Sequence, residues 1–219
     1  MKTEKIAINN HIFELHPCGA VYWQEADMLL LADVHLGKIT HFRKAGFAVP
    51  PASIHGNFKK LDGVIEHFNP GTVCFLGDLF HSDINREWEL FSDWACNLGR
   101  KIVLVIGNHD ILPETRYCDL RMDVVPEMEV AGFLLTHIPE QREGFFNFCG
   151  HIHPCVRLQG VGRQYLKLPC FFTKKNQMIL PAFGDFTGMY ELVPTETDRI
   201  WAIAKDEIIE ISVQRKRRA

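Results

Sequence analysis

The chain has 219 residues, a length typical of one large domain, and 47% of them are hydrophobic, which is enough to form a substantial buried core. Its formal net charge of −3 argues against a protein whose binding depends on overall positive charge, and we interpret the basic cluster at residues 215–218 as a solvated tail. The longest apolar runs are far too short for a transmembrane helix, so we expect no membrane association.

The start of the chain and its cysteines indicate the compartment. The first ten residues contain no long apolar stretch, so nothing there resembles a secretory signal. The seven cysteines are scattered without a CxxC pair, which indicates reduced thiols rather than a disulfide framework. We therefore expect a cytoplasmic protein. No repeat or linker interrupts the chain, and we expect a single domain over residues 1–219.

The first half of the chain predicts strands that alternate with helices. Residues 5–23 predict two or three short strands, and residues 28–32 form a continuous apolar run typical of a buried strand. A helix follows from about residue 54 to 68, with Ser53 as its predicted N-cap. A strand at 72–76, a helix at 86–98 with Gly99 after its end, and a strand at 102–106 complete a β-α-β-α-β order.

Beyond residue 110 the pattern changes to short apolar runs without long helices between them. Strands are predicted around residues 124–125, 133–135, 148, 156–158, 166–172, 178–180 and 208–211. These runs predict a second sheet, largely antiparallel, that packs on the first.

Five short motifs carry side chains that bind metal ions, and each motif ends or follows a predicted buried strand. Strand ends are where an α/β protein gathers its functional residues. The candidate ligands are Asp33, His35, Asp78, Asn108, His137, His151 and His153. Each motif alone is weak, because a single histidine after a strand is more often structural. The occurrence of all five in order is what makes the set specific.

The donor types indicate which metals and which chemistry to expect. Mixed carboxylate, amide and imidazole donors suit Mn²⁺, Fe or Zn²⁺ better than Ca²⁺. Asp33 and His35 would serve a first ion, Asp78 has two oxygens with which to bridge two ions, and Asn108 would serve the second. Two such ions would lie about 3.5–4 Å apart, lower the pKa of a bridging water, and neutralise a phosphoryl group under attack by that water or hydroxide. The set therefore favours hydrolysis of a phosphate ester.

Two residues beside the candidate ligands have predicted catalytic roles. His109 follows Asn108, and we expect its ring to face the substrate, where it would protonate the leaving oxygen or stabilise the equatorial oxygens. Asp110 has two interpretations, either to orient His109 through its other ring nitrogen or to cap the segment that follows.

The motifs resemble the pattern of the calcineurin-like metallophosphoesterase superfamily, D-x-H, G-D, G-N-H-[DE], H and G-H-x-H, and every position is met between residues 33 and 153. The resemblance implies an α/β fold, a four-layer α/β/β/α sandwich in which helices flank two packed mixed sheets. It also implies that His109 is catalytic. The first metal ion would be held by Asp33, His35, Asp78 and His153. The second would be held by Asp78, Asn108, His137 and His151.

The flanking segments are similar to a narrower group, the bacterial ligase-associated DNA-damage-response endonucleases. The similarity lies in residues 36–38, 41–46, 49–50, 77–82 and 180–188. It implies a manganese-dependent phosphodiesterase that acts on DNA in repair, and association with a DNA ligase and a helicase. The oligomeric state is left open.

Four further side chains are candidates for substrate contacts. Lys38, His41 and Arg43 follow the first motif closely, and each could meet a phosphate group. For Arg43 a solvated surface position is an equal alternative. His81 lies three residues after Asp78 and could touch the substrate, with a surface histidine as the alternative.

Two other functions compete with a nucleic-acid phosphodiesterase. The first is a phosphohydrolase for nucleotides or other small molecules, since the chain is short and acidic and has no obvious DNA-binding appendage. The second is a non-catalytic scaffold for protein interaction on the same fold. The presence of His109 and of all the candidate ligands argues against the scaffold.

Overall fold

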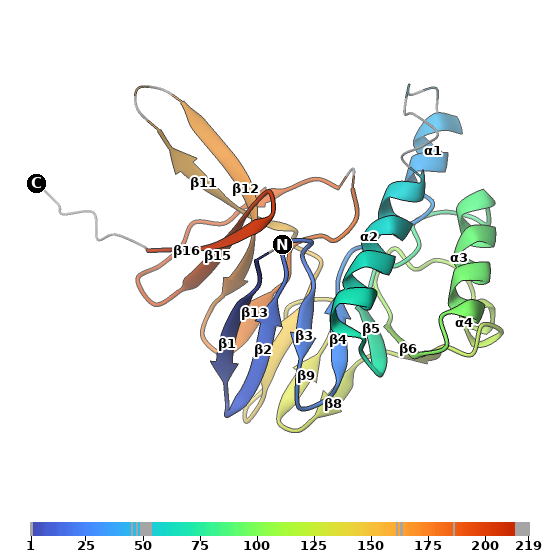
Figure 1. The fold of residues 1–219 in the computed structure, drawn as a ribbon, viewed down its shortest axis with the longest axis horizontal. Helices are drawn as coiled ribbons and strands as arrows, with labels where there is room; N and C mark the ends of the chain where they lie inside the picture. Colours follow the sequence, from blue (N-terminus) through green and yellow to red (C-terminus); the bar gives the residue numbers. More distant parts are fainter. Residues whose placement is uncertain are drawn as a thin grey trace, which may run out of the picture.

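Two mixed β-sheets pack face to face in the computed structural model, with helices on one side (Figure 1). The structure describes residues 2–44, 46, 48, 54–160, 162, 164–185 and 187–212; within this range nothing is described for the side chains of residues 41, 42 and 44. The predicted N-cap Ser53 and the basic cluster at 215–218 lie outside the described residues.

The first sheet has seven strands that lie side by side in chain order. They are β1 (Glu4–Ile8), β2 (His11–Leu15), β3 (Val21–Trp23), β4 (Met28–Leu31), β5 (Thr72–Leu76), β6 (Lys101–Val105) and β7 (Asp123–Val125). Neighbours are antiparallel from β1 to β4 and parallel from β4 to β7. Because β4, β5 and β6 are parallel, the loops that follow them emerge at the same edge of the sheet.

Helices cover one face of the parallel part of this sheet. They are α1 (Lys38–Lys44), α2 (Ile54–Phe68), α3 (Arg86–Asn97) and α4 (Glu114–Cys118). The two long helices match the predicted ones, and their apolar faces pack on strand residues such as Val73 and Leu104. Helix α3 begins because the Asn85 side chain accepts a hydrogen bond from Glu87 N–H (2.8 Å), and Gly99 follows its end with φ of +67°.

The second sheet is formed by the rest of the chain. Its strands are β8 (Met128–Val130), β9 (Phe133–Leu135), β10 (Phe146–Cys149), β11 (Pro154–Gln159), β12 (Tyr165–Thr173), β13 (Gln177–Ile179), β14 (Tyr190–Glu191), β15 (Arg199–Ala204) and β16 (Glu207–Ile211). The main order is β14-β11-β12-β13-β10-β9-β8, and β15 pairs with β12 and β16. Of the pairings described, five are antiparallel and three parallel.

An aromatic core joins the two sheets. Phe13 of the first sheet contacts Phe133 and Phe148 of the second, and Trp23 of the first sheet contacts Phe133, with ring centroids 4.7–5.2 Å apart. All four side chains are fully buried. Each contributes about 1.5–3 kcal/mol through burial of apolar surface, so this contact fixes one sheet on the other.

The expected α/β sandwich with two packed mixed sheets is confirmed, with two differences in detail. The strand predicted at residues 124–125 belongs to the first sheet, because β7 pairs in parallel with β6 after the short helix α4. All helices of the described residues lie between Lys38 and Cys118, so the helical layer described covers the first sheet. No helix in the described part of the chain is long and apolar enough to cross a membrane.

Candidate metal centre

Five loops at the ends of strands bring the seven candidate ligands together. Asp33 and His35 follow β4, Asp78 follows β5 and Asn108 follows β6. The second sheet contributes the remaining three, because the ends of β9 and β10 face the same edge; these are His137, His151 and His153. Two groups of these side chains are close enough to hold a metal ion. One consists of Asp33, His35 and His153, and the other of Asp33, Asp78 and His137.

Contacts divide the seven side chains into two sets that share Asp78. In the first set His35 Nε2 lies 3.8 Å from Asp78 Oδ2 and 3.4 Å from His153 Nε2. In the second set His137 Nε2 lies 3.4 Å from Asp78 Oδ1, 3.0 Å from Asn108 Oδ1 and 3.2 Å from His151 Nδ1. The two groups that could each hold an ion share Asp33 instead, and His137 Nδ1 also lies 4.0 Å from Asp33 Oδ1. Which side chain serves which ion therefore stays a prediction.

Backbone geometry at the centre is unusual. Five candidate ligands have positive φ, between +50° and +71°; they are Asp33, His35, Asp78, His151 and His153. Non-glycine residues in this region cost of order 1–3 kcal/mol each, and such residues concentrate at functional sites. The surrounding structure therefore maintains a costly backbone in order to direct these side chains inward.

Two glycines allow the loops to approach one another. A Cβ on Gly107 would lie 2.3 Å from both N and Oδ1 of Asp78. A Cβ on Gly150 would lie 2.5 Å from Oδ2 of Asp33. Because no real Cβ tolerates such distances, each glycine of the G-N-H and G-H-x-H motifs makes room for a carboxylate of another loop.

Backbone carbonyls fix how two imidazoles are turned. His137 Nδ1 lies 3.0 Å from Leu76 O, and His153 Nδ1 lies 3.1 Å from Gly188 O. A carbonyl can only accept, so each Nδ1 carries a proton, and in this tautomer of the neutral ring the lone pair of Nε2 faces the centre.

These lone pairs face carboxylate oxygens, and this makes the site fit cations. Nε2 of His153 lies 3.2 Å from Asp33 Oδ1, which is fully buried and accepts no hydrogen bond from the described residues. Nε2 of His137 lies 3.4 Å from Asp78 Oδ1. Two acceptors at this distance repel each other unless the imidazole takes a second proton or a cation lies between them. One such pair occurs in each set, so two cations would relieve both.

Burial and charge set the protonation of the histidines. Burial, assisted by Lys38, lowers the pKa of His35 to about 2, so this ring is neutral at pH 7. Burial, and then His137, lowers the pKa of His151. Burial is the largest influence on the pKa of His153 and lowers it, but the hydrogen bond and charge of Asp33, together with the Gly188 carbonyl, raise the net pKa. Neutral imidazole is the form that binds a metal ion.

His109 lies at the exposed rim of the centre. Its backbone N–H donates to Asp78 Oδ1 (2.9 Å), which ties the residue to the bridging carboxylate of the proposed site. Its ring centroid is 4.1 Å from that of His81 and 5.8 Å from that of His35. The position at the rim is compatible with the expected contact between His109 and a substrate, and it places His81 beside it.

Asp110 has contacts that the sequence did not suggest. Its Oδ2 accepts from the N–H groups of Asp78 (2.9 Å) and Gly107 (2.8 Å), and its Oδ1 accepts from Phe80 N–H (3.0 Å). Burial raises the pKa of Asp110 to about 6, although these N–H groups favour the charged form. Both oxygens are thus engaged by backbone amides, and the described contacts favour a role in joining two loops over the orientation of His109.

The candidate substrate contacts lie in different situations. Lys38, the first residue of α1, is close enough to Asp78 and Asp33 for their charges to act on it, and burial lowers its pKa overall. Arg43 is exposed on the same helix, as the solvated alternative expects. The side chain of His41 lies outside the described residues.

Sequence reasoning missed Glu87, which supports the first loop. This buried carboxylate accepts from Gly37 N–H and Thr40 N–H, both at 2.8 Å, and so holds the turn after His35 and the start of α1. In the sequence Glu87 resembles any acidic residue in the first turn of a helix, because its partners are about 50 positions away.

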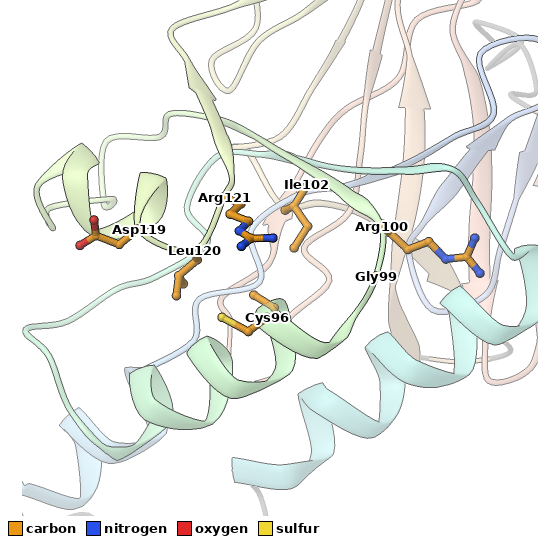
Figure 2. A pocket seen from close by; sticks show the side chains of 8 residues that line it. Cys96, Gly99, Arg100, Ile102, Asp119, Leu120 and Arg121 are labelled. Atoms are coloured by element: carbon orange, nitrogen blue, oxygen red, sulfur yellow. The ribbon is translucent and has the colours of Figure 1, made fainter.

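A separate cavity of 580 Å³ lies away from this centre (Figure 2). Its lining comes from the end of α3, the start of β6 and the segment after α4, and includes Cys96, Arg100 and Arg121. Because Asn108 follows the other end of β6, this cavity and the candidate metal centre lie at opposite ends of that strand.

Comparisons with known proteins found one matching family model and similar solved structures. A family model described as calcineurin-like phosphoesterase matches residues 28–169, which is more than half of the chain. The crystal structure of a nuclease, MPE, from Pseudomonas putida has 27% identity and a TM-score of 0.80, over 96% of this chain and 100% of that one. The phosphoesterase Yfce from E. coli has 13% identity and a TM-score of 0.45, over 85% and 99%. No curated protein sequence matches the chain.

Proposed function

The chain belongs to the calcineurin-like phosphoesterase family of metal-dependent hydrolases, and on this premise we propose that it is a phosphodiesterase that uses two divalent ions and cleaves nucleic acid. The observation that carries the proposal is the pair of facing acceptors, one in each set of side chains, at Asp33 with His153 and at Asp78 with His137. Such a donor set suits Mn²⁺, with Fe or Zn²⁺ as alternatives.

The seven side chains divide the work of holding the ions. Asp33, His35, Asp78 and His153 would hold one ion, and Asp78, Asn108, His137 and His151 would hold the other. When bound, the ions would lower the pKa of a water and neutralise charge on the phosphoryl group. The carbonyls of Leu76 and Gly188 keep two imidazoles turned inward, so the site is preorganised before substrate arrives.

His109 is the proposed acid. It is exposed at the rim and tied through its backbone to Asp78, so its ring can reach a substrate oxygen without being a ligand. It would donate a proton to the leaving oxygen or stabilise charge on the phosphoryl oxygens. Lys38, at the start of α1, and His81, in the segment after β5, would contact the phosphate groups of the substrate.

The nucleic-acid part of the proposal is supported by the likeness to the Pseudomonas putida nuclease over nearly the whole of both chains. A role in DNA repair, and association with a DNA ligase or a helicase, rest on the sequence resemblance of the flanking segments. A nucleotide or other small phosphodiester is the alternative substrate class, because the net charge of −3 gives no overall attraction to a polyanion.

The test of the chemistry is hydrolysis of bis(p-nitrophenyl) phosphate in the presence of Mn²⁺. We expect His109→Ala to lower kcat by at least ~10²-fold while the bound metal content is unchanged. His55→Ala, at an exposed position of α2, is the matched control and should keep wild-type activity. A wild-type protein that binds both ions and hydrolyses no phosphodiester would contradict the proposal and favour a scaffold.

The test of the substrate class compares single-stranded and duplex oligonucleotides with a panel of nucleotides and cyclic nucleotides. We expect cleavage of an oligonucleotide with a higher kcat/KM than for any nucleotide. Rapid turnover of one nucleotide without cleavage of any oligonucleotide would transfer the assignment to the alternative class.

A further inference from the structure

The hairpin of β11 and β12 projects from the second sheet (Figure 1). Strand β11 begins at Pro154, directly after the candidate ligand His153, so the hairpin leads away from the metal centre. Figure 1 shows it and α1, which carries Lys38, on the upper side of the molecule. The hairpin is therefore placed to meet parts of a substrate that extend beyond the reacting phosphate.

The two faces of the hairpin differ in chemistry. Register pairs Cys155 with Pro169, Arg157 with Lys167 and Gln159 with Tyr165, and these six residues share one face because side chains alternate along a strand. The opposite face is apolar and contributes Val156, Leu158 and Leu168 to a small core. The first face thus presents two cations, an amide and an aromatic ring to solvent. These exposed side chains do not contribute to the packing of the hairpin on the core.

An aromatic ring and a guanidinium are stacked on this polar face. The Arg157 guanidinium carbon lies 4.2 Å from the ring centroid of Tyr165, and Tyr165 is 59% exposed. Both residues line a groove of 420 Å³ together with Gln159, Gln164 and Glu191. The one carboxylate of the groove is neutralised, since Glu191 Oε2 lies 3.1 Å from Lys167 Nζ.

The same face is continuous with the metal centre. A further cavity, of 220 Å³, is lined by both His153 and Pro169, together with residues that include Lys60 and Thr187. Pro169 lies on the polar face, one alternate position from Lys167. A path therefore runs from His153 through Pro169 and Lys167 to Tyr165.

We propose that this face of the hairpin, residues 157–159 and 164–167, binds unpaired nucleotides of the substrate strand next to the cleaved phosphate. A base would stack on Tyr165 and Arg157 would contact a phosphate group, as in grooves that bind single strands. Lys167 offsets the negative charge of Glu191, which would otherwise repel the strand. The inference rests on the proposed function and narrows its substrate to nucleic acid with a single-stranded segment.

The dimensions and chemistry favour a single strand over a duplex or a protein. The six residues of β11 that follow His153 extend for about 20 Å. A strand of at most about six stacked nucleotides covers this distance. A base in a duplex is already stacked on its neighbours and cannot use the exposed ring of Tyr165. The combination of an exposed aromatic ring with neighbouring cations, rather than a broad apolar patch, distinguishes this face from a protein-docking surface.

The test uses the full chain in chelating buffer, where the strand can bind without being cleaved. Anisotropy of a labelled oligothymidylate of about ten nucleotides reports Kd. We expect Tyr165→Ala to weaken binding by about 5- to 150-fold, the range measured for loss of one stacked base. Tyr190→Ala is the matched control, because Tyr190 is 64% exposed and lies on β14, which pairs with β11, but does not line the groove.

A second measurement tests the phosphate contact. Arg157→Ala should reduce the slope of log Kd against log salt by about 0.7, the value for one phosphate of a single strand. Arg199→Ala is the matched control, since its guanidinium also lies over an aromatic ring, 4.5 Å from the centroid of Trp201, but on β15. This control should leave the slope unchanged.

The outcomes separate the inference from the proposed function. If the wild type cleaves oligonucleotides and Tyr165→Ala binds them within about two-fold of wild type, the inference is wrong and the proposed function stands. Equal binding of blunt duplex and single strand would also overturn it. If the wild type hydrolyses a small diester but neither binds nor cleaves any oligonucleotide, the nucleic-acid function and the inference fail together.

Discussion

Replacing Asp110 by asparagine should loosen the centre without removing any proposed ligand. The Asp110 carboxylate accepts three backbone N–H groups that belong to the loops after β5 and β6. Asparagine has one oxygen, which can keep the N–H groups of Asp78 and Gly107, both on Oδ2. Its NH₂ group would then face Phe80 N–H, which becomes a buried donor without an acceptor.

The expected cost follows from these contacts. A buried donor left without its acceptor costs about 1–3 kcal/mol, and replacing the charged acceptor of the two remaining hydrogen bonds by a neutral one costs about 1 kcal/mol more. We expect Asp110→Asn to lower the free energy of unfolding by about 2–4 kcal/mol, a large share of the ~5–15 kcal/mol typical of a domain. For a chain of this length that corresponds to a fall in Tm of about 5–15 °C.

Urea unfolding and calorimetric Mn²⁺ titration would measure the effect. Affinity for Mn²⁺ should fall together with stability, because the loop that carries Asp78 shifts when Phe80 N–H in the same loop loses its acceptor. Asp119→Asn, at an exposed position, is the control and should change neither quantity. An Asp110→Asn variant with wild-type stability and metal affinity but reduced kcat would refute the loop-joining role and restore the orientation of His109.

Three other changes give separate checks. Gly107→Ala should abolish activity and weaken metal binding, because the added Cβ would overlap Asp78 of the neighbouring loop. Gly63→Ala is the control: its Cβ meets no heavy atom within 4 Å, so the variant should have unchanged stability or gain up to ~1 kcal/mol. Equal effects of the two substitutions on metal binding would contradict the close packing at Gly107. Glu87→Gln should lower Tm and raise the KM for bis(p-nitrophenyl) phosphate, because Glu87 holds the turn after His35. Glu89→Gln, at an exposed position, is the control. A Glu87→Gln variant with wild-type Tm and KM would show that the turn needs no carboxylate. Burial and then His67 lower the pKa of His16 from 6.5 to about 4, so the folded state favours the neutral ring and stability is lost as pH falls from 6.5 towards 4. In chelating buffer the Tm of His16→Asn should therefore fall less over this pH range than the Tm of wild type. Parallel curves of Tm against pH for the two proteins would contradict this prediction.

The sequence predicted the part of the fold in which local patterns carry the information. Strand β5 occupies the predicted residues, and α2 and α3 agree within a residue or two, because apolar periodicity and the glycine after α3, Gly99, are local signals. The strands that precede the first three motifs are buried apart from the first residue of β5 and of β6, so their carboxyl ends were visible as the change from apolar to polar residues.

Long-range contacts set the limits of the prediction. Strand β7 joins β6 rather than the second sheet, and its three residues contain no signal of which neighbour they pair with. Glu87 and Asp110 serve the centre through backbone N–H groups of other loops, a role that any acidic residue of a sequence could have. The polar face of β11 and β12 needed the cross-strand register, which brings Arg157 and Lys167 together.

The most direct measurement is the number of Mn²⁺ ions bound per chain, determined after equilibrium dialysis in wild type, His153→Ala and Asp78→Ala. The account predicts two ions in wild type, one in His153→Ala, where only the first set is damaged, and a severe loss of both in Asp78→Ala, where the shared carboxylate is removed. Phosphodiesterase activity should follow the loss of ions. A folded wild-type protein that binds one ion or none, and remains fully active in chelating buffer, would contradict the two-ion phosphodiesterase proposed for this chain.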